Sequence, residues 1–207
     1  MRRLNLCVLA SGKGSNLNSI INSQKSKKIS SKVALVISNN SDSGALELAR
    51  KHKIPAHHLS EKQFNSRKNF DNAFLKLLNK YKIDLIILAG YMKLLSPKIV
   101  RKYKNRILNL HPALLPFFAG TGMYGMKVHE AVLEAGCKVS GASIHIVDEI
   151  YDHGPIISQK TVKISDTETP QTLRKKIQKI EHKLYPETIR LFETKKLNIK
   201  GRKVYFT

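Results

Sequence analysis

Short apolar runs of strand length alternate with helix-patterned segments through the first half of this 207-residue chain. Leu4–Ala10 and Lys32–Ser38 are two such runs. Leu85–Ala89 is apolar without in–out alternation, which is typical of a strand covered on both faces. Between the runs, apolar residues recur at the spacing of one helix face, as at Leu17 and Ile20. This alternation predicts a mostly parallel α/β sheet with right-handed crossovers.

The second half has a different pattern, with two longer strands that we expect to pair antiparallel. A long amphipathic helix follows them, and Pro186 within it predicts a kink or a split. We therefore expect an α/β fold with one domain over residues 1–207, a mostly parallel Rossmann-like sheet, an antiparallel C-terminal portion and a long C-terminal helix. The remaining predicted strands are Ile54–Leu59, Ile107–Leu110, Val139–Val147, Ile156–Val162 and a hairpin in Leu197–Phe206. The predicted helices are Asn16–Ser26, Gly44–His52, Phe64–Tyr81, Ser96–Tyr103 (capped by Ser96), Val128–Ala135 and Pro170–Leu191.

The composition limits the classes of function. The formal net charge is +22, from 37 Lys and Arg against 15 Asp and Glu, which raises the possibility of a nucleic-acid binder. However, 28 of the basic residues are Lys and 9 are Arg, spread one or two at a time, whereas proteins that read the grooves of DNA use Arg heavily. No stretch approaches the ~20 apolar residues of a membrane span. The 2 cysteines suit a cytoplasmic location and cannot form a four-ligand zinc site, so we expect no metal.

Three polar clusters fall where predicted strands end, which is where ligands bind in such sheets. The first, Ser11–Leu17, is a glycine-rich turn into a helix and could receive a phosphate at the helix N-terminus. The alternative is an ordinary glycine turn in which Ser15 or Asn16 caps the helix. The second cluster is Gly90–Leu95, and the third is Asn109–Pro116.

The third cluster carries the clearest chemical signal. Alternation along a strand places Asn109 and His111 on the same side, where an amide and an imidazole could stabilise an oxyanion and move protons. A loop with three carboxylates, Asp148–Pro155, could set an acid beside His111 and raise its pKa. The alternatives are a structural histidine and a solvated acidic turn.

Taken in order, these motifs resemble one family. Ser-Gly-Lys-Gly-Ser-Asn-Leu, Leu-Ala-Gly-Tyr-Met-Lys-Leu-Leu-Ser-Pro and Asn-Leu-His-Pro-Ala-Leu-Leu-Pro are similar to the phosphoribosylglycinamide formyltransferases, the folate-dependent enzymes of purine synthesis. Ser143–His145, Asp152–Pro155 and Glu181–Pro186 extend the resemblance over nearly the whole chain. The family often has Asn where Lys13 stands and Ser where Ala113 stands.

The resemblance implies a site, residue by residue. It implies a catalytic trio of Asn109, His111 and Asp152, with no metal. For the ribonucleotide substrate it implies contacts from Gly14, Ser15, Asn16, Gln178 and Glu181. For the folate it implies Arg67, Met92, Lys93, Leu94, Leu95 and Asn109.

The implied reaction is attack of the glycinamide ribonucleotide amine on the formyl carbon of 10-formyltetrahydrofolate, the co-substrate, through a tetrahedral intermediate. Asn109 and a His111 kept charged by Asp152 would stabilise the oxyanion. The implied partners are therefore small anionic molecules rather than nucleic acid or membrane. Two relatives remain as alternatives: a methionyl-tRNA formyltransferase, expected to carry a further C-terminal domain, and a formyltetrahydrofolate hydrolase, expected to carry an N-terminal one. A non-catalytic nucleic-acid binder is the alternative from another class.

Overall fold

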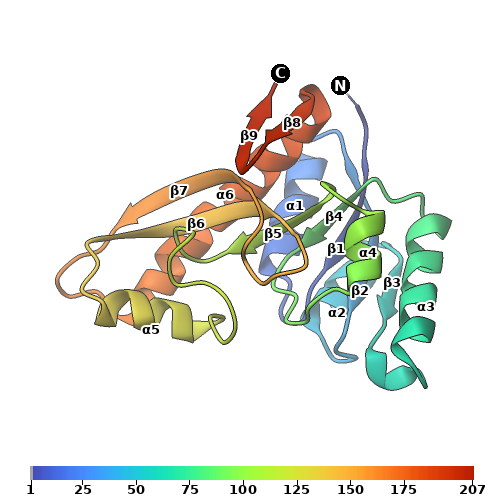
Figure 1. Cartoon of the computed structure of the whole chain (residues 1–207), viewed down its shortest axis with the longest axis horizontal. Coiled ribbons are helices and arrows are strands. Elements are labelled where there is room, and N and C mark those ends of the chain that lie inside the picture. The colour runs from blue at the N-terminus through green and yellow to red at the C-terminus, as the bar shows by residue number, and fades with distance from the viewer. Residues whose placement is uncertain (1) are drawn as a thin grey trace.

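The computed structural model describes residues 2–207, and within them seven strands form one sheet in the order β3-β2-β1-β4-β5-β6-β7 (Figure 1). The strands are β1 (Asn5–Leu9), β2 (Lys32–Ser38), β3 (Ala56–His58), β4 (Leu85–Leu88), β5 (Ile107–His111), β6 (Val139–Ile146) and β7 (Ile156–Lys163). The helices are α1 (Ser15–Lys25), α2 (Gly44–Lys51), α3 (Arg67–Lys80), α4 (Pro97–Lys102), α5 (Met126–Glu134) and α6 (Pro170–Thr194). A separate hairpin pairs β8 (Leu197–Lys200) with β9 (Lys203–Phe206).

The predicted fold class is confirmed. The pairs formed among β1 to β5 are parallel, whereas β6 pairs antiparallel with both β5 and β7. The register sets Asn109 of β5 beside Leu88 of β4 on one side and His145 of β6 on the other. The change from parallel to antiparallel pairing thus occurs at the strand that carries the Asn-Leu-His-Pro motif.

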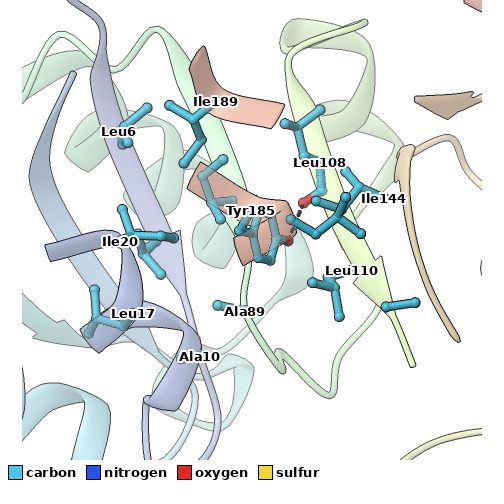
Figure 2. Packing of buried hydrophobic residues seen from close by; sticks show 14 of the residues in the cluster. Leu6, Ala10, Leu17, Ile20, Ala89, Leu108, Leu110, Ile144, Tyr185 and Ile189 are labelled. Atoms are coloured by element: carbon cyan, nitrogen blue, oxygen red, sulfur yellow. Dashed lines mark hydrogen bonds between the residues drawn. The ribbon is translucent and has the colours of Figure 1, made fainter. Parts of the chain in front are cut away.

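Helices cover both faces of the sheet, and each face has its own buried cluster. Residues of α1, α2, α5 and α6 pack on one face, and residues of α3 and α4 pack on the other. Tyr185 of α6 is fully buried at the centre of the first cluster (Figure 2), where its hydroxyl donates to the carbonyl of Leu88 at 2.5 Å and lies 3.4 Å from that of Leu108. No helix within residues 2–207 is long and apolar enough to cross a membrane.

Of the two outcomes expected at Pro186, a kink or a split, the split does not occur, because α6 runs as one helix over 25 residues. Proline lacks the N–H that would bond to the carbonyl four residues earlier, that of His182. The hydroxyl of Ser19, on α1, donates to this carbonyl at 2.5 Å. A partner 163 residues away in sequence therefore satisfies the group that the proline leaves free. A second difference is local: Phe64 ends a short 3₁₀ turn (Glu61–Gln63), so that α3 begins at Arg67 after its cap Ser66.

Three helices end at a lysine in the left-handed conformation. Lys27, Lys53 and Lys82 follow α1, α2 and α3 with φ of 57°, 55° and 49°. After α2, the amide of Lys53 bonds to the carbonyl of Arg50 at 2.9 Å and the next amide bonds to that of Ala49, which is the Schellman pattern. Glycine is favoured at this position because a Cβ makes the left-handed conformation costly.

We predict that glycine at these positions stabilises the protein. Lys53→Gly and Lys82→Gly should each raise the free energy of unfolding by about 0.5 kcal/mol, because relief of the left-handed strain exceeds the chain entropy lost by glycine. Urea denaturation measures this effect. Lys76→Gly, at an exposed position inside α3, is the matched control and should lower stability by about 1 kcal/mol. A loss of stability in all three variants would contradict the prediction.

Candidate active site

The three predicted polar clusters meet at the carboxyl ends of β1, β4 and β5, around a cavity of about 390 Å³. Ser11 ties the first two clusters together. Its amide donates to the carbonyl of Gly90 at 2.9 Å, and its hydroxyl accepts from the amide of Met92 at 2.9 Å. The cavity therefore lies where strands of a parallel sheet present their loops, as the fold class leads one to expect.

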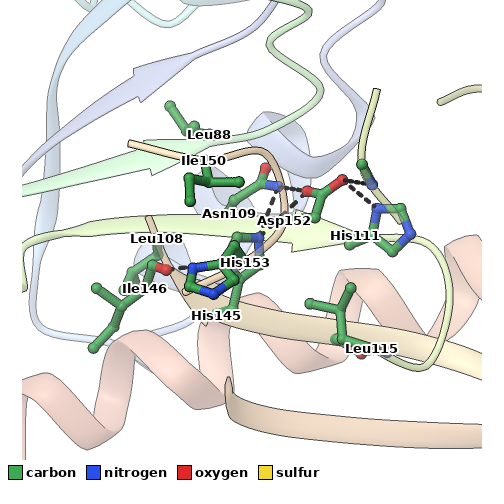
Figure 3. Close-up of polar contacts among 12 residues, drawn as sticks. Leu88, Leu108, Asn109, His111, Leu115, His145, Ile146, Ile150, Asp152 and His153 are labelled. Carbon is green, nitrogen blue, oxygen red and sulfur yellow. Dashed lines mark hydrogen bonds and ion pairs between the residues drawn. The ribbon is translucent and has the colours of Figure 1, made fainter. Parts of the chain in front are cut away.

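Asn109, His111 and Asp152 lie side by side in this cavity, joined by a hydrogen bond and a contact between the imidazole and the carboxylate (Figure 3). Asn109 Nδ2 donates to Asp152 Oδ1 at 3.0 Å, and His111 Nδ1 lies 3.4 Å from Asp152 Oδ2. The amide of Gly120 donates to the same Oδ2 at 3.2 Å. The structure thus brings together the three residues that the resemblance implied, and it places the carboxylate between the other two.

The backbone at Asp152 is strained, with φ of 51° in the left-handed region. Two residues on, Gly154 passes so close to β6 that a Cβ would lie 1.8 Å from the carbonyl oxygen of Ile146. Burial raises the pKa of the Asp152 carboxyl, but His145, His111 and the amide of Gly120 together lower it by more. The net pKa lies below its ordinary value, so Asp152 is ionised at neutral pH.

Asp152 raises the pKa of His111, as expected, but not enough to keep the imidazole charged at neutral pH. His111 is 3% exposed, and burial lowers its pKa more than Asp152 and the carbonyl of Phe118 raise it. In this structure His111 is therefore mostly neutral at pH 7. Its Nε2 lies 2.7 Å from the Phe118 carbonyl, so both ring nitrogens face an acceptor. The neutral ring donates to one of them, and the imidazolium donates to both.

His145, to which the sequence assigned no role, orients Asn109 from the neighbouring strand. Its Nδ1 lies 2.9 Å from the carbonyl of Ile146, which fixes the proton on that nitrogen and leaves Nε2 as an acceptor. Asn109 Nδ2 lies 3.1 Å from this Nε2. Both hydrogens of the amide therefore have partners, His145 and Asp152. The antiparallel pairing of β6 with β5 brings His145 there, and the sequence pattern alone does not reveal that register.

Four of the predicted ribonucleotide residues line the same cavity: Ser15, Asn16, Gln178 and Glu181. Gln178 donates to the Ser15 hydroxyl at 3.0 Å, and Asn16 donates to Glu181 Oε2 at 3.0 Å. Burial raises the pKa of Glu181.

Gly14 precedes α1 as its N-cap, with φ of 79°, and a Cβ there would lie 2.9 Å from Cα of Ala45. Among the described residues, no side chain caps this helix, so the capping by Ser15 or Asn16 that the sequence allowed is not observed. The first-turn amides of α1 are therefore not taken up by a side-chain cap beside the cavity.

The predicted folate residues divide between the cavity and its surroundings. Met92 lines the cavity, whereas Leu95 is 4% exposed and belongs to the core on the α3 side. Lys93 is exposed. Arg67 reaches this segment from α3, donating to the carbonyl of Leu94 at 3.3 Å, and pairs with Glu61. Arg67 and residues 92–95 are thus brought together at the cavity rim.

Arg174, His129 and Tyr124 also line the cavity, although the sequence did not single them out. Arg174 lies one helical turn before Gln178, so the spacing of α6 could have indicated it. His129 is 3% exposed, and its Nδ1 has no partner within residues 2–207. Within the same range, no group of three or more His, Cys, Asp or Glu side chains is arranged to hold a metal ion.

Comparison with known proteins places these features in one family. Residues 4–189 match the family model described as formyl transferase. A chloroplastic phosphoribosylglycinamide formyltransferase of Arabidopsis thaliana is 41% identical over 189 residues, which are 91% of this chain. The match covers 65% of that protein, so this chain spans just under two thirds of the relative's length. The phosphoribosylglycinamide formyltransferase of Escherichia coli is 37% identical over 95% of this chain and 90% of its own length. The structure of glycinamide ribonucleotide transformylase 1 from Symbiobacterium toebii is 40% identical, with a TM-score of 0.91 over 99% of this chain and 94% of that one.

We predict that His129 makes stability depend on pH. Burial, with Arg174 and His111 nearby, lowers its pKa to about 4, below the ordinary value of 6.5. The unfolded chain therefore binds more protons, and stability is lost as the pH falls below the unfolded pKa. Between pH 8 and pH 5 this histidine should cost about 2 kcal/mol. Denaturation of His129→Gln across that range should show a correspondingly smaller loss, and His58→Gln is the control. Identical pH dependence in wild type and His129→Gln would contradict the assignment.

Proposed function

The chain belongs to the formyl transferase family of enzymes, and we propose that it formylates glycinamide ribonucleotide in purine biosynthesis. The predicted resemblance to phosphoribosylglycinamide formyltransferases is confirmed. The proposed formyl donor is 10-formyltetrahydrofolate. The observation that carries the proposal is that one cavity is lined both by Asn109, His111 and Asp152 and by Ser15, Gln178 and Glu181.

The reaction needs a developing oxyanion to be stabilised and one proton to be moved. The amine of glycinamide ribonucleotide attacks the formyl carbon, and the carbonyl oxygen becomes an oxyanion. When the intermediate collapses, the bond from carbon to the folate nitrogen breaks, the amine has lost one proton and the folate nitrogen has gained one. His111 is the imidazole in the cavity beside a carboxylate, and we assign it this proton transfer.

The lowered pKa of His111 fits this role. In the free protein, burial keeps the imidazole mostly neutral at pH 7. An oxyanion that forms next to it adds a negative charge, which raises the pKa of His111 as the reaction proceeds. The imidazolium is then favoured in the transition state more than in the ground state, which is the condition for catalysis.

For the reaction to proceed, the substrates have to displace hydrogen-bond acceptors that His111 and Asn109 have in the free protein. The carbonyl of Phe118 accepts from His111 Nε2 in the free protein, and the reacting groups have to take its place. At Asn109, the oxyanion would replace one acceptor of the amide. We expect it to replace Nε2 of His145, because the charged Asp152 is the stronger acceptor.

Both proposed substrates are anions, and cations lie around the cavity to receive them. Arg174 lines the cavity, one helical turn before Gln178. Arg67, Lys13 and Lys93 lie on the three segments that the resemblance assigns to phosphate and folate. We propose that the ribonucleotide phosphate lies between the N-terminus of α1 and Arg174. That residues 1–207 form one formyltransferase domain is part of the same proposal, and a cytoplasmic location stays a prediction.

An assay of the purified protein tests the proposed function. With glycinamide ribonucleotide and 10-formyltetrahydrofolate as substrates, we expect deformylated folate to form, and its absorbance measures the rate. Omission of the ribonucleotide should abolish the signal, which separates transfer from hydrolysis. Turnover that does not depend on the ribonucleotide, or no turnover, would overturn the proposal.

We predict that Asp152→Asn lowers kcat by about 100-fold. The variant loses the charge that raises the His111 pKa, so the fall of activity at low pH, where His111 is already protonated before attack, should also move to lower pH. Steady-state rates between pH 5 and pH 9 measure both effects. Asp166→Asn, at an exposed carboxylate paired with Lys138, is the control and should behave as wild type. An Asp152→Asn variant with the wild-type rate and pH profile would remove Asp152 from the mechanism.

A further inference from the structure

The C-terminal hairpin reaches the loop that carries Asp152. Arg202 lies in the turn between β8 and β9. Its Nη2 donates to the backbone carbonyl of His153 at 2.6 Å, and its Nη1 lies 3.2 Å from His153 Nε2. Figure 1 shows the hairpin at the C-terminus of the chain, beside α6. One planar guanidinium thus holds both the backbone and the ring of the residue that follows Asp152.

His153 passes this contact to the start of the same loop. Its Nδ1 lies 2.6 Å from Asp148 Oδ2, and the other carboxylate oxygen of Asp148 accepts from the amide of Ile150 at 3.0 Å. The neutral ring with its proton on Nδ1 satisfies both partners, since it donates to the carboxylate and accepts from the guanidinium. Arg202, His153 and Asp148 therefore form a chain across the loop, which we call the loop clamp.

The loop needs such support because its backbone is under strain. Asp152 is left-handed, and Gly154 leaves no room beside β6 for a different path. A strained conformation persists when its surroundings hold it in place. The carboxylate of Asp152 is also the group that meets Asn109 and His111, so a shift of the loop changes both contacts at once.

We propose that Arg202 is a positioning residue for formyl transfer, which acts through the loop clamp to hold Asp152 against Asn109 and His111. The inference rests on the proposed function, in which Asp152 takes part in catalysis. The contacts of the loop clamp are largely exposed, so they contribute little to global stability. Their effect is on geometry, where a displacement of about 1 Å can cost as much as 100-fold in rate.

Kinetics of the full-length protein test this role. Arg202→Ala should lower kcat roughly tenfold and leave KM for glycinamide ribonucleotide within about twofold. Arg202→Lys keeps the positive charge but cannot make both contacts with the geometry of a guanidinium, so its kcat should lie between those of the wild type and Arg202→Ala. Lys203→Ala, one residue further along the same hairpin, is the control and should retain the wild-type kcat.

A double-mutant comparison separates positioning from a general loss of structure. In the Asp152→Asn background, Arg202→Ala should change kcat by less than about twofold, because the group that it positions is already altered. His153→Ala removes the loop clamp from its other side and should match Arg202→Ala, with no further loss when the two are combined. A wild-type kcat in Arg202→Ala, or an undiminished effect in the Asp152→Asn background, would overturn the inference.

Amide hydrogen exchange supplies a readout that does not depend on activity. Residues 148–154 should exchange faster in Arg202→Ala than in wild type or Lys203→Ala. Unchanged exchange overturns the loop clamp even if the wild-type enzyme is fully active. If the wild-type protein shows no formyl transfer, the proposed function fails and the catalytic role of Arg202 fails with it, while faster exchange would still show that Arg202 holds the loop.

Discussion

The buried carboxylate of Asp152 is the interaction on which the site depends. It has partners from two parts of the fold: Asn109 and His111 on β5, and the amide of Gly120 in the loop between β5 and α5. A buried charge without such partners would cost several kcal/mol, so the site is stable only when these segments converge. The sheet makes them converge by switching from parallel to antiparallel pairing at β5. The same switch delivers His145, which orients Asn109.

Much of the fold followed from local sequence, because buried parallel strands and amphipathic helices differ in their apolar period. Asn109 and His111 could be placed on one side of a strand for the same reason. What could not be predicted depends on contacts between distant segments. Pro186 is accommodated because Ser19, from α1, bonds to the carbonyl that the proline leaves free. The pKa of His111 is lowered because burial outweighs the neighbouring carboxylate, and burial is a property of the folded chain.

The large excess of Lys has in part a structural role, whereas the sequence alone gave it none. Lysines 27, 53 and 82 form the left-handed C-terminal caps of three helices, and Lys25 and Lys80 lie in last turns, where a cation interacts favourably with the helix dipole. These positions lie away from the cavity, at the ends of helices that run back to the start of the next strand. Arg174 and Arg67 are the arginines that the structure places at the cavity or its rim. The overall charge and the charge of the site are thus separate features of this chain.

In the proposed mechanism Asp152 works through His111 and not as an independent group. The most direct test is the kcat of Asp152→Asn, His111→Gln and the double variant, measured under saturating substrates. Residues that act as one unit lose their function together, so the double variant should be about as slow as the slower single variant. A double variant whose loss equals the product of the two single losses would contradict the account.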